Sequence, residues 1–128
     1  MIVEGHQIRT GYGNDLLDNV KSLRRILCPM NNVFDKYKEV LGIVSKLEKE
    51  CLILVALGPT AELLVYDLMK KGYQSIDIGQ IDIDYWWYLL GVEKRVPIPN
   101  RCVSQLPPTE IEEVNDVEYR DSIVEQIF

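Results

Sequence analysis

The most informative pattern of hydrophobic and polar positions lies between Cys51 and Ile83. It opens with a continuous apolar run, Leu52 to Leu57, that is too short for an isolated helix and lacks the alternation of a half-exposed strand. Runs of this kind are typical of strands that are buried on both faces. The run therefore predicts a central strand of a parallel sheet.

A helical pattern follows this strand, after a break at Gly58-Pro59-Thr60. Pro59 in the first turn, Thr60 as a candidate cap and Gly72 just past the last turn mark the start and the end of the helix. The next segment, Gln74 to Ile78, predicts a second strand, so the block is a β-α-β unit. In such units a ligand binds beyond the carboxyl ends of the strands, where helix N-termini expose N–H groups that suit a phosphate.

Other elements are predicted on both sides of this block from helical spacing, from alternation and from Gly, Pro and Asn punctuation. They are a strand at 2–4, a brief helix at 16–20 capped by Asn14 or Asp15, a strand at 23–28 stopped by Pro29, an amphipathic helix at 33–50, a helix at 81–90, for which a strand is also arguable, and a helical pattern at Tyr119, Ile123, Val124 and Ile127.

This order of elements predicts an α/β fold with three layers and a mostly parallel, Rossmann-like sheet. We expect residues 1–128 to form a single domain, with an extended, acidic segment at 92–128 that packs on it. The predicted edge strands, 2–4 and 74–78, have no evident cover. We therefore expect either a part, about half, of a larger fold or a protomer that pairs through a sheet edge or an apolar face, as in a homo-oligomer.

Composition narrows the class of protein further. The chain has 128 residues, 47% of them hydrophobic and 27% charged, and its longest apolar run is far too short to span a membrane. The net charge of −6 argues against non-specific binding to nucleic acid. Three widely spaced cysteines and the lack of a signal-like start predict free thiols in the cytoplasm.

Two glycine-containing turns are candidate phosphate-binding sites. Gly11-x-Gly13-Asn14-Asp15 precedes a predicted helix, and its backbone N–H groups could hold a phosphate, although many such glycine pairs are only turns. Gly58-Pro59-Thr60-Ala61 lies at a strand-to-helix corner, which is where α/β proteins bind ligands.

The aromatic segment carries two further candidates. Asp82-x-Asp84 has the form that holds Mg²⁺ or Mn²⁺ against a diphosphate, and the alternative is an acidic helix start. The block from Tyr85 to Tyr88 suits stacking on a base or a sugar, and the alternative is a core or an oligomer interface. A single histidine, His6, excludes a multi-histidine metal site within the chain.

Taken together, several runs resemble the C-terminal half of bacterial glycosyltransferases of the GT-D type. The runs that carry the resemblance are Val3-Glu4-Gly5, Arg9-x-Gly11-x-Gly13-Asn14-Asp15-Leu16, Arg25-Ile26-Leu27-Cys28-Pro29, Phe34-Asp35-Lys36-Tyr37, Ala56-Leu57-Gly58-Pro59-Thr60-Ala61, Lys71-Gly72-Tyr73-Gln74 and Asp77-Ile78-Gly79-x-Ile81-Asp82-Ile83.

The resemblance implies a Rossmann-like enzyme that transfers a hexose from a UDP-sugar to a glycan or glycoprotein acceptor with a divalent metal, Mn²⁺ or Mg²⁺. It places residues 11–15 and 58–61 along the UDP-sugar cleft and Gln80 with Asp82 at the metal. Gln80 replaces the usual histidine, and the acidic D-x-E element of the family lies upstream of the matching residues. The chain is thus interpreted as a truncated or divergent domain. The alternatives are a non-catalytic module that self-associates and a small-molecule binding domain without transfer chemistry.

Overall fold

The computed structural model describes residues 1–128 and is built on one sheet of five strands that all run parallel. The order across the sheet is β4-β3-β1-β2-β5. The predicted α/β fold with a parallel sheet is confirmed. The strands are β1 (Ile2–Gly5), β2 (Arg25–Cys28), β3 (Ile53–Ala56), β4 (Ser75–Asp77) and β5 (Ile123–Gln126).

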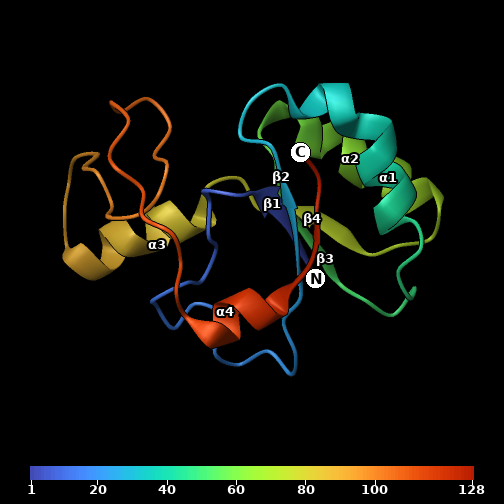
Figure 1. Ribbon diagram of the computed structural model, residues 1–128, viewed down its shortest axis with the longest axis horizontal. Coiled ribbons are helices and arrows are strands. Elements are labelled where there is room, and N and C mark those ends of the chain that lie inside the picture. Colours follow the sequence, from blue (N-terminus) through green and yellow to red (C-terminus); the bar gives the residue numbers. More distant parts are fainter.

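Helices and loops cover the sheet on both sides (Figure 1). Helices α1 and α2 pack against each other on one face, while α4 and the long loop between β1 and β2 lie on the other. Helix α3 projects from the sheet at the left of Figure 1. The helices are the 3₁₀ helix η1 (Val33–Lys36), α1 (Tyr37–Val44), α2 (Pro59–Lys70), α3 (Ile81–Leu90) and α4 (Val117–Ser122).

The two faces of the sheet differ in chemistry because successive side chains of a strand point to opposite sides. Val3 lies level with Ile26 and Val55 in the register, and all three join the apolar core under α1 and α2. Glu4 and Arg25 belong to the opposite face, where both are buried. One face is therefore an ordinary hydrophobic core, and the other contains buried charges.

The prediction that residues 2–4 form an edge strand is wrong. β1 is the central strand, hydrogen-bonded to β2 and β3, and Ile2, Val3 and Glu4 are all 0% exposed. The sequence showed no evident cover for this segment, whereas the structure places β2 and β3 beside it, and Arg25 on β2 pairs with Glu4 in the interior. β4 is an edge as predicted, and the other edge is β5, which the sequence patterns did not reveal.

Three predicted helices also differ from the structure. Residues 16–20 form turns with hydrogen bonds from Asp18 N–H to Asp15 and from Val20 N–H to Leu17. The pattern across 33–50 divides into η1 and α1, which ends at Val44. The helical pattern at the C-terminal end stops with α4, because the open edge of β2 offers the following residues a strand to pair with.

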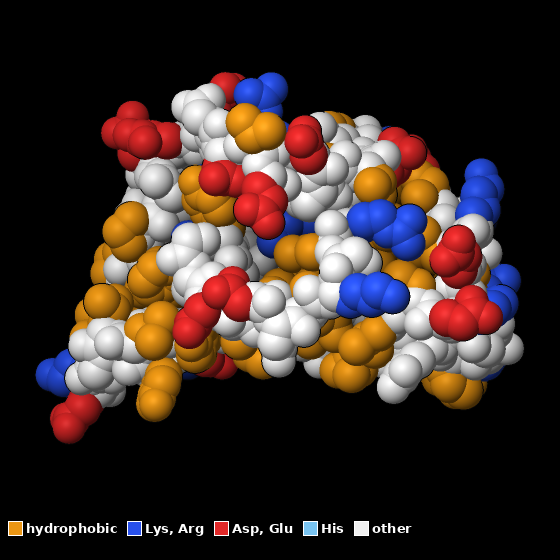
Figure 2. All heavy atoms as spheres, turned by 90° about the horizontal axis from the view of Figure 1, so that it is seen from below, with side chains coloured by type: hydrophobic (Ala, Val, Ile, Leu, Met, Phe, Trp, Pro, Cys, Tyr) orange, Lys and Arg blue, Asp and Glu red, His pale blue; other side chains and the backbone are white.

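The aromatic block belongs to α3, as predicted, but its two tryptophans are half-buried. Trp86 and Trp87 pack against a small cluster around Ile83 and Ile98, and the Trp87 indole N–H donates to the Val96 carbonyl at 2.9 Å. Tyr88 is 77% exposed. Figure 2 shows hydrophobic side chains gathered over this end of the molecule.

No helix of the structure has the length and apolarity to cross a membrane.

The three cysteines lie apart as free thiols, and we expect them to differ in reactivity. Cys28 is 0% exposed, and burial, with smaller contributions from two glutamates, raises the pKa of its thiol to about 12. Because the thiolate is the reactive form, Ellman's reagent at pH 8 should modify Cys51 and Cys102 in the folded protein and Cys28 only after denaturation. Rapid modification of all three thiols in the folded protein would contradict this buried environment.

Candidate functional site

The order of the strands reverses direction between β1 and β3. The chain moves from β1 outward to β2, returns to β3 on the other side, and continues outward to β4. Ligands of parallel α/β sheets bind in the crevice outside the carboxyl ends of the strands at such a switch point. Here the carboxyl ends of β1, β2 and β3 open into a cleft of about 330 Å³, lined by Gly5, Ile8, Pro29 to Phe34 and Ala56 to Thr60.

One wall of the cleft is the corner between β3 and α2. Gly58 is the N-cap of α2, with φ 55° and ψ −143°, and Pro59 occupies the first helical position. A side chain is rarely tolerated at these angles, which explains the glycine. A Cβ atom built on Gly58 would meet no atom within 4 Å, so the space in front of the corner is open.

Three of the four residues predicted at this corner line the cleft, namely Gly58, Pro59 and Thr60. Ala61 does not: it is 0% exposed, belongs to the core, and its N–H donates back to the Gly58 carbonyl at 2.9 Å. The N–H groups of Gly58 and Thr60 make no hydrogen bond within the backbone. These N–H groups, at the positive end of a helix of 12 residues, suit a phosphate.

The opposite wall follows β2 and was not predicted. It consists of Met30, Asn31 and Asn32, with Val33 and Phe34 from η1. The sequence held a usable signal, because Pro29 ends a predicted parallel strand whose carboxyl end belongs to the same edge as that of residues 52–57. The same rule that selected Gly58 would have selected this segment.

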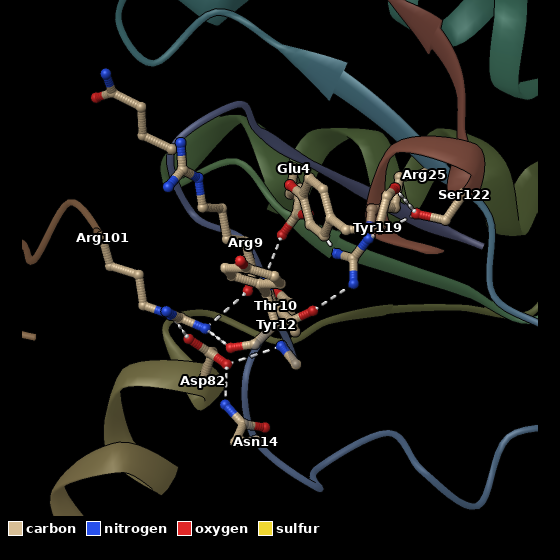
Figure 3. A network of polar contacts seen from close by, with 12 residues as sticks. Glu4, Arg9, Thr10, Tyr12, Asn14, Arg25, Asp82, Arg101, Tyr119 and Ser122 are labelled. Atoms are coloured by element: carbon tan, nitrogen blue, oxygen red, sulfur yellow. Dashed lines mark hydrogen bonds and ion pairs between the residues drawn. The ribbon is translucent and has the colours of Figure 1, made fainter. Parts of the chain in front are cut away.

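The glycine-rich loop at 11–15 lies elsewhere, on α3 (Figure 3). The Gly11 N–H and the Asn14 side-chain amide each donate to the same oxygen of Asp82, Oδ1, at 2.8 Å. Gly13 lies beside α3, and the Asp15 carboxylate accepts a hydrogen bond from Tyr85. None of these four loop residues lines the cleft at Gly58, so the structure does not bring the two predicted phosphate-binding segments to one cavity.

The predicted metal pair does not fit a divalent cation in this arrangement. Asp82 is 1% exposed, and its second oxygen, Oδ2, accepts a hydrogen bond from Arg101 Nε at 2.6 Å. Its carboxylate thus already accepts hydrogen bonds from three donors, one of which is the cationic Arg101. The Gln80 side chain is turned to Asp84, to which its amide donates at 3.0 Å. No group of three or more His, Cys, Asp or Glu side chains within residues 1–128 is placed to hold a metal.

A second buried ion pair lies on the same side of the sheet (Figure 3). Arg25 Nη1 lies 2.6 Å from Glu4 Oε1, and its Nη2 donates to the Thr10 carbonyl at 2.7 Å. The Thr10 N–H donates to the other Glu4 oxygen at 2.8 Å. Burial raises the pKa of the Glu4 carboxyl, and the charge of Arg25 opposes that rise. No pattern in the sequence predicted this pair.

Two further arginines fix the loop after β1 to the segment at 97–112. Arg9 donates to the carbonyl oxygens of Asn100, at 3.0 Å, and Glu112, at 2.6 Å. Arg101 donates to the carbonyls of Arg9 and Tyr12 while it pairs with Asp82. Buried charges and their hydrogen bonds therefore hold the loop after β1 in place.

Comparison with known proteins gives a consistent result at the level of sequence. Residues 1–106 match the family described as the glycosyltransferase GT-D fold. The "Probable glycosyl transferase Gly" of Streptococcus gordonii is 40% identical over 121 residues, which are 94% of this chain and 17% of that protein. The glycosyltransferase GlyD of Streptococcus pneumoniae serotype 4 is 38% identical over 129 residues, covering 100% of this chain and 16% of that protein.

Solved structures agree with this match. A domain of unknown function 1792 described as having a distinct glycosyltransferase fold is 44% identical, with a TM-score of 0.93 over 99% of this chain and 46% of that chain. A glycosyltransferase from Streptococcus sanguinis is 38% identical, with a TM-score of 0.93 over 99% of this chain and 48% of that one. The chain thus spans under half of these solved chains and about a sixth of the curated relatives.

Proposed function

Because the chain belongs to the GT-D glycosyltransferase family, we propose that it supplies the donor-nucleotide cleft of an enzyme that transfers a hexose from a UDP-sugar to a glycan or glycoprotein acceptor. The observation that supports this most is the open cleft at the switch point between β1 and β3. That is the place where parallel α/β sheets bind nucleotides.

The chemistry of the cleft suits the diphosphate of such a donor. In hexose transfer, the bond between the anomeric carbon and the diphosphate oxygen breaks, a bond to an acceptor hydroxyl oxygen forms, and the hydroxyl proton leaves. Negative charge therefore develops on the departing UDP. The N–H groups at Gly58 and Thr60 and the positive end of α2 favour that charge. We derive no step through a metal, because Gln80 and Asp82 do not fit one.

The proposal predicts that UDP binds to this chain and that Gly58→Ala weakens the binding. A left-handed φ with ψ near −143° costs a non-glycine residue about 1–3 kcal/mol, so the corner should rearrange and lose its alignment. We expect a UDP dissociation constant that is higher by a factor on the order of ten, since about 1.4 kcal/mol corresponds to a factor of ten. Isothermal titration calorimetry with UDP, with and without Mn²⁺, provides the measurement.

Gly42→Ala is the matched control for this variant. Gly42 lies within α1, and a Cβ atom there also meets nothing within 4 Å. Alanine in a helix should stabilise the protein by up to about 1 kcal/mol and leave UDP binding unchanged. An absence of heat from the unmodified chain at millimolar UDP would overturn the proposed function.

The predicted homo-oligomer stays a prediction. One of the two edges of the sheet is β5, where Val124 is 50% exposed, and Phe128, just after the strand, is 63% exposed. Exposed strand edges can pair with another chain. β5 is bonded to β2 at the opposite side of the sheet from β4, and none of its residues lines the cleft.

A further inference from the structure

We infer that Asn32 and Phe34 recognise the nucleobase of the donor, an inference that rests on the proposed function and deepens it. Both residues line the wall of the cleft opposite Gly58. No charged side chain lines this cleft. Recognition in it therefore depends on stacking, on hydrogen bonds from neutral groups and on the backbone at the corner of α2.

Phe34 provides a stacking surface. The Phe34 side chain is 60% exposed, although the preceding residue of η1, Val33, is buried in the core. Its ring stacks on that of Tyr37, with centroids 5.7 Å apart and an angle of 26° between the planes. One side of the Phe34 ring is thus supported and its exposed part borders the cleft. Stacking on an aromatic ring is a common way for proteins to bind a flat base.

Asn32, two residues before Phe34, provides an amide that caps no helix. It occupies the N-cap position of η1, where asparagine ordinarily accepts a hydrogen bond from the first turn, but its side chain makes no such bond. The cause is its left-handed backbone, with φ 53° and ψ 33°, because a capping residue normally has extended angles. The amide, which carries both a donor and an acceptor, is therefore available in the wall of the cleft.

The two walls together define an orientation for the ligand. The corner at Gly58 and Thr60 suits phosphate, and the wall of Asn32 and Phe34 suits a neutral ring whose edge offers a donor next to an acceptor. The uracil of UDP has such an edge, with N3–H between two carbonyl oxygens. The cleft volume of about 330 Å³ is at the lower end of small-molecule sites.

Titrations of the 128-residue chain with UDP and with pyrophosphate separate base recognition from phosphate binding. Phe34→Ala should weaken UDP binding about tenfold and change pyrophosphate binding less than twofold. Phe34→Tyr keeps the ring and should bind UDP like the unmodified chain. Asn32→Gly removes the amide but tolerates the left-handed angles, so it should weaken UDP binding about fivefold without lowering the melting temperature.

Tyr88→Ala is the control, because Tyr88 is an exposed aromatic residue on α3 that does not line the cleft. Its UDP binding should be unchanged. The inference is overturned if Phe34→Ala and Asn32→Gly bind UDP as tightly as the unmodified chain does. It is also overturned if the two variants weaken pyrophosphate binding as much as they weaken UDP binding. If the unmodified chain binds UDP no more tightly than pyrophosphate, the inference alone is overturned. If it binds neither ligand, the proposed function is overturned.

Discussion

Replacing Glu4 with alanine is expected to lower the free energy of unfolding by about 3–5 kcal/mol, because it leaves a buried arginine without its counter-charge. Arg25 is 2% exposed and pairs with Glu4 at 2.6 Å. The substitution also leaves the Thr10 N–H without its acceptor in the interior. Urea unfolding followed by circular dichroism provides the measurement, with the slope of the transition checked for change.

A double variant tests whether the loss comes from the unpaired charge. Glu4→Leu combined with Arg25→Met replaces the pair with apolar side chains of similar size, which is often close to neutral. We expect the double variant to regain most of the stability that Glu4→Ala loses. If Glu4→Ala unfolds within about 1 kcal/mol of the unmodified chain, the pair is not buried as the structure has it.

Asp82→Ala is expected to have a loss of similar size, about 3–5 kcal/mol. Asp82 is 1% exposed, and its removal leaves Arg101, which is 4% exposed, as an uncompensated buried charge. It also removes the acceptor that holds the loop at Gly11 and Asn14. The loop should then become mobile, which amide hydrogen exchange at residues 9–14 will show as faster exchange, alongside the lower unfolding free energy.

Asp84→Ala is a matched control that also separates two roles of the D-x-D pattern. Asp84 lies in the same first turn of α3, is exposed, and accepts a hydrogen bond only from the Gln80 side chain. Its replacement should change stability by less than about 0.5 kcal/mol. Should both aspartates prove equally dispensable for stability while both are needed for Mn²⁺ binding, the pattern would be a metal site and the structural role of Asp82 would be excluded.

Local patterns were sufficient for the β3-α2-β4 unit of the fold. The apolar run at 52–57, the Gly58-Pro59 break and the helical spacing after it predicted β3 and α2, and the segment at 74–78 predicted β4. Each of these signals depends on neighbours within one element. The same is true of α3, whose glycine brackets and acidic first turn were correct.

Position within the sheet could not be predicted in the same way. Whether β1 is an edge or the central strand depends on which distant segments pair with it. The residues around Glu4 in the sequence do not indicate that Arg25 will lie beside it. β5 likewise forms because β2 leaves an open edge, although the spacing of apolar residues from Tyr119 onward favours a helix.

The sequence by itself determined the β3-α2 corner and therefore one wall of the candidate site, because strand, glycine and helix start are adjacent in the chain. The sequence also held a signal for the segment after β2, but only the tertiary structure decided that its Asn32 and Phe34 line the same cleft and that residues 11–15 instead bind Asp82. The physical reason is that the members of each pairing lie far apart along the chain. Parallel strand pairing and buried charges bring them together, and neither leaves a periodic pattern in the sequence.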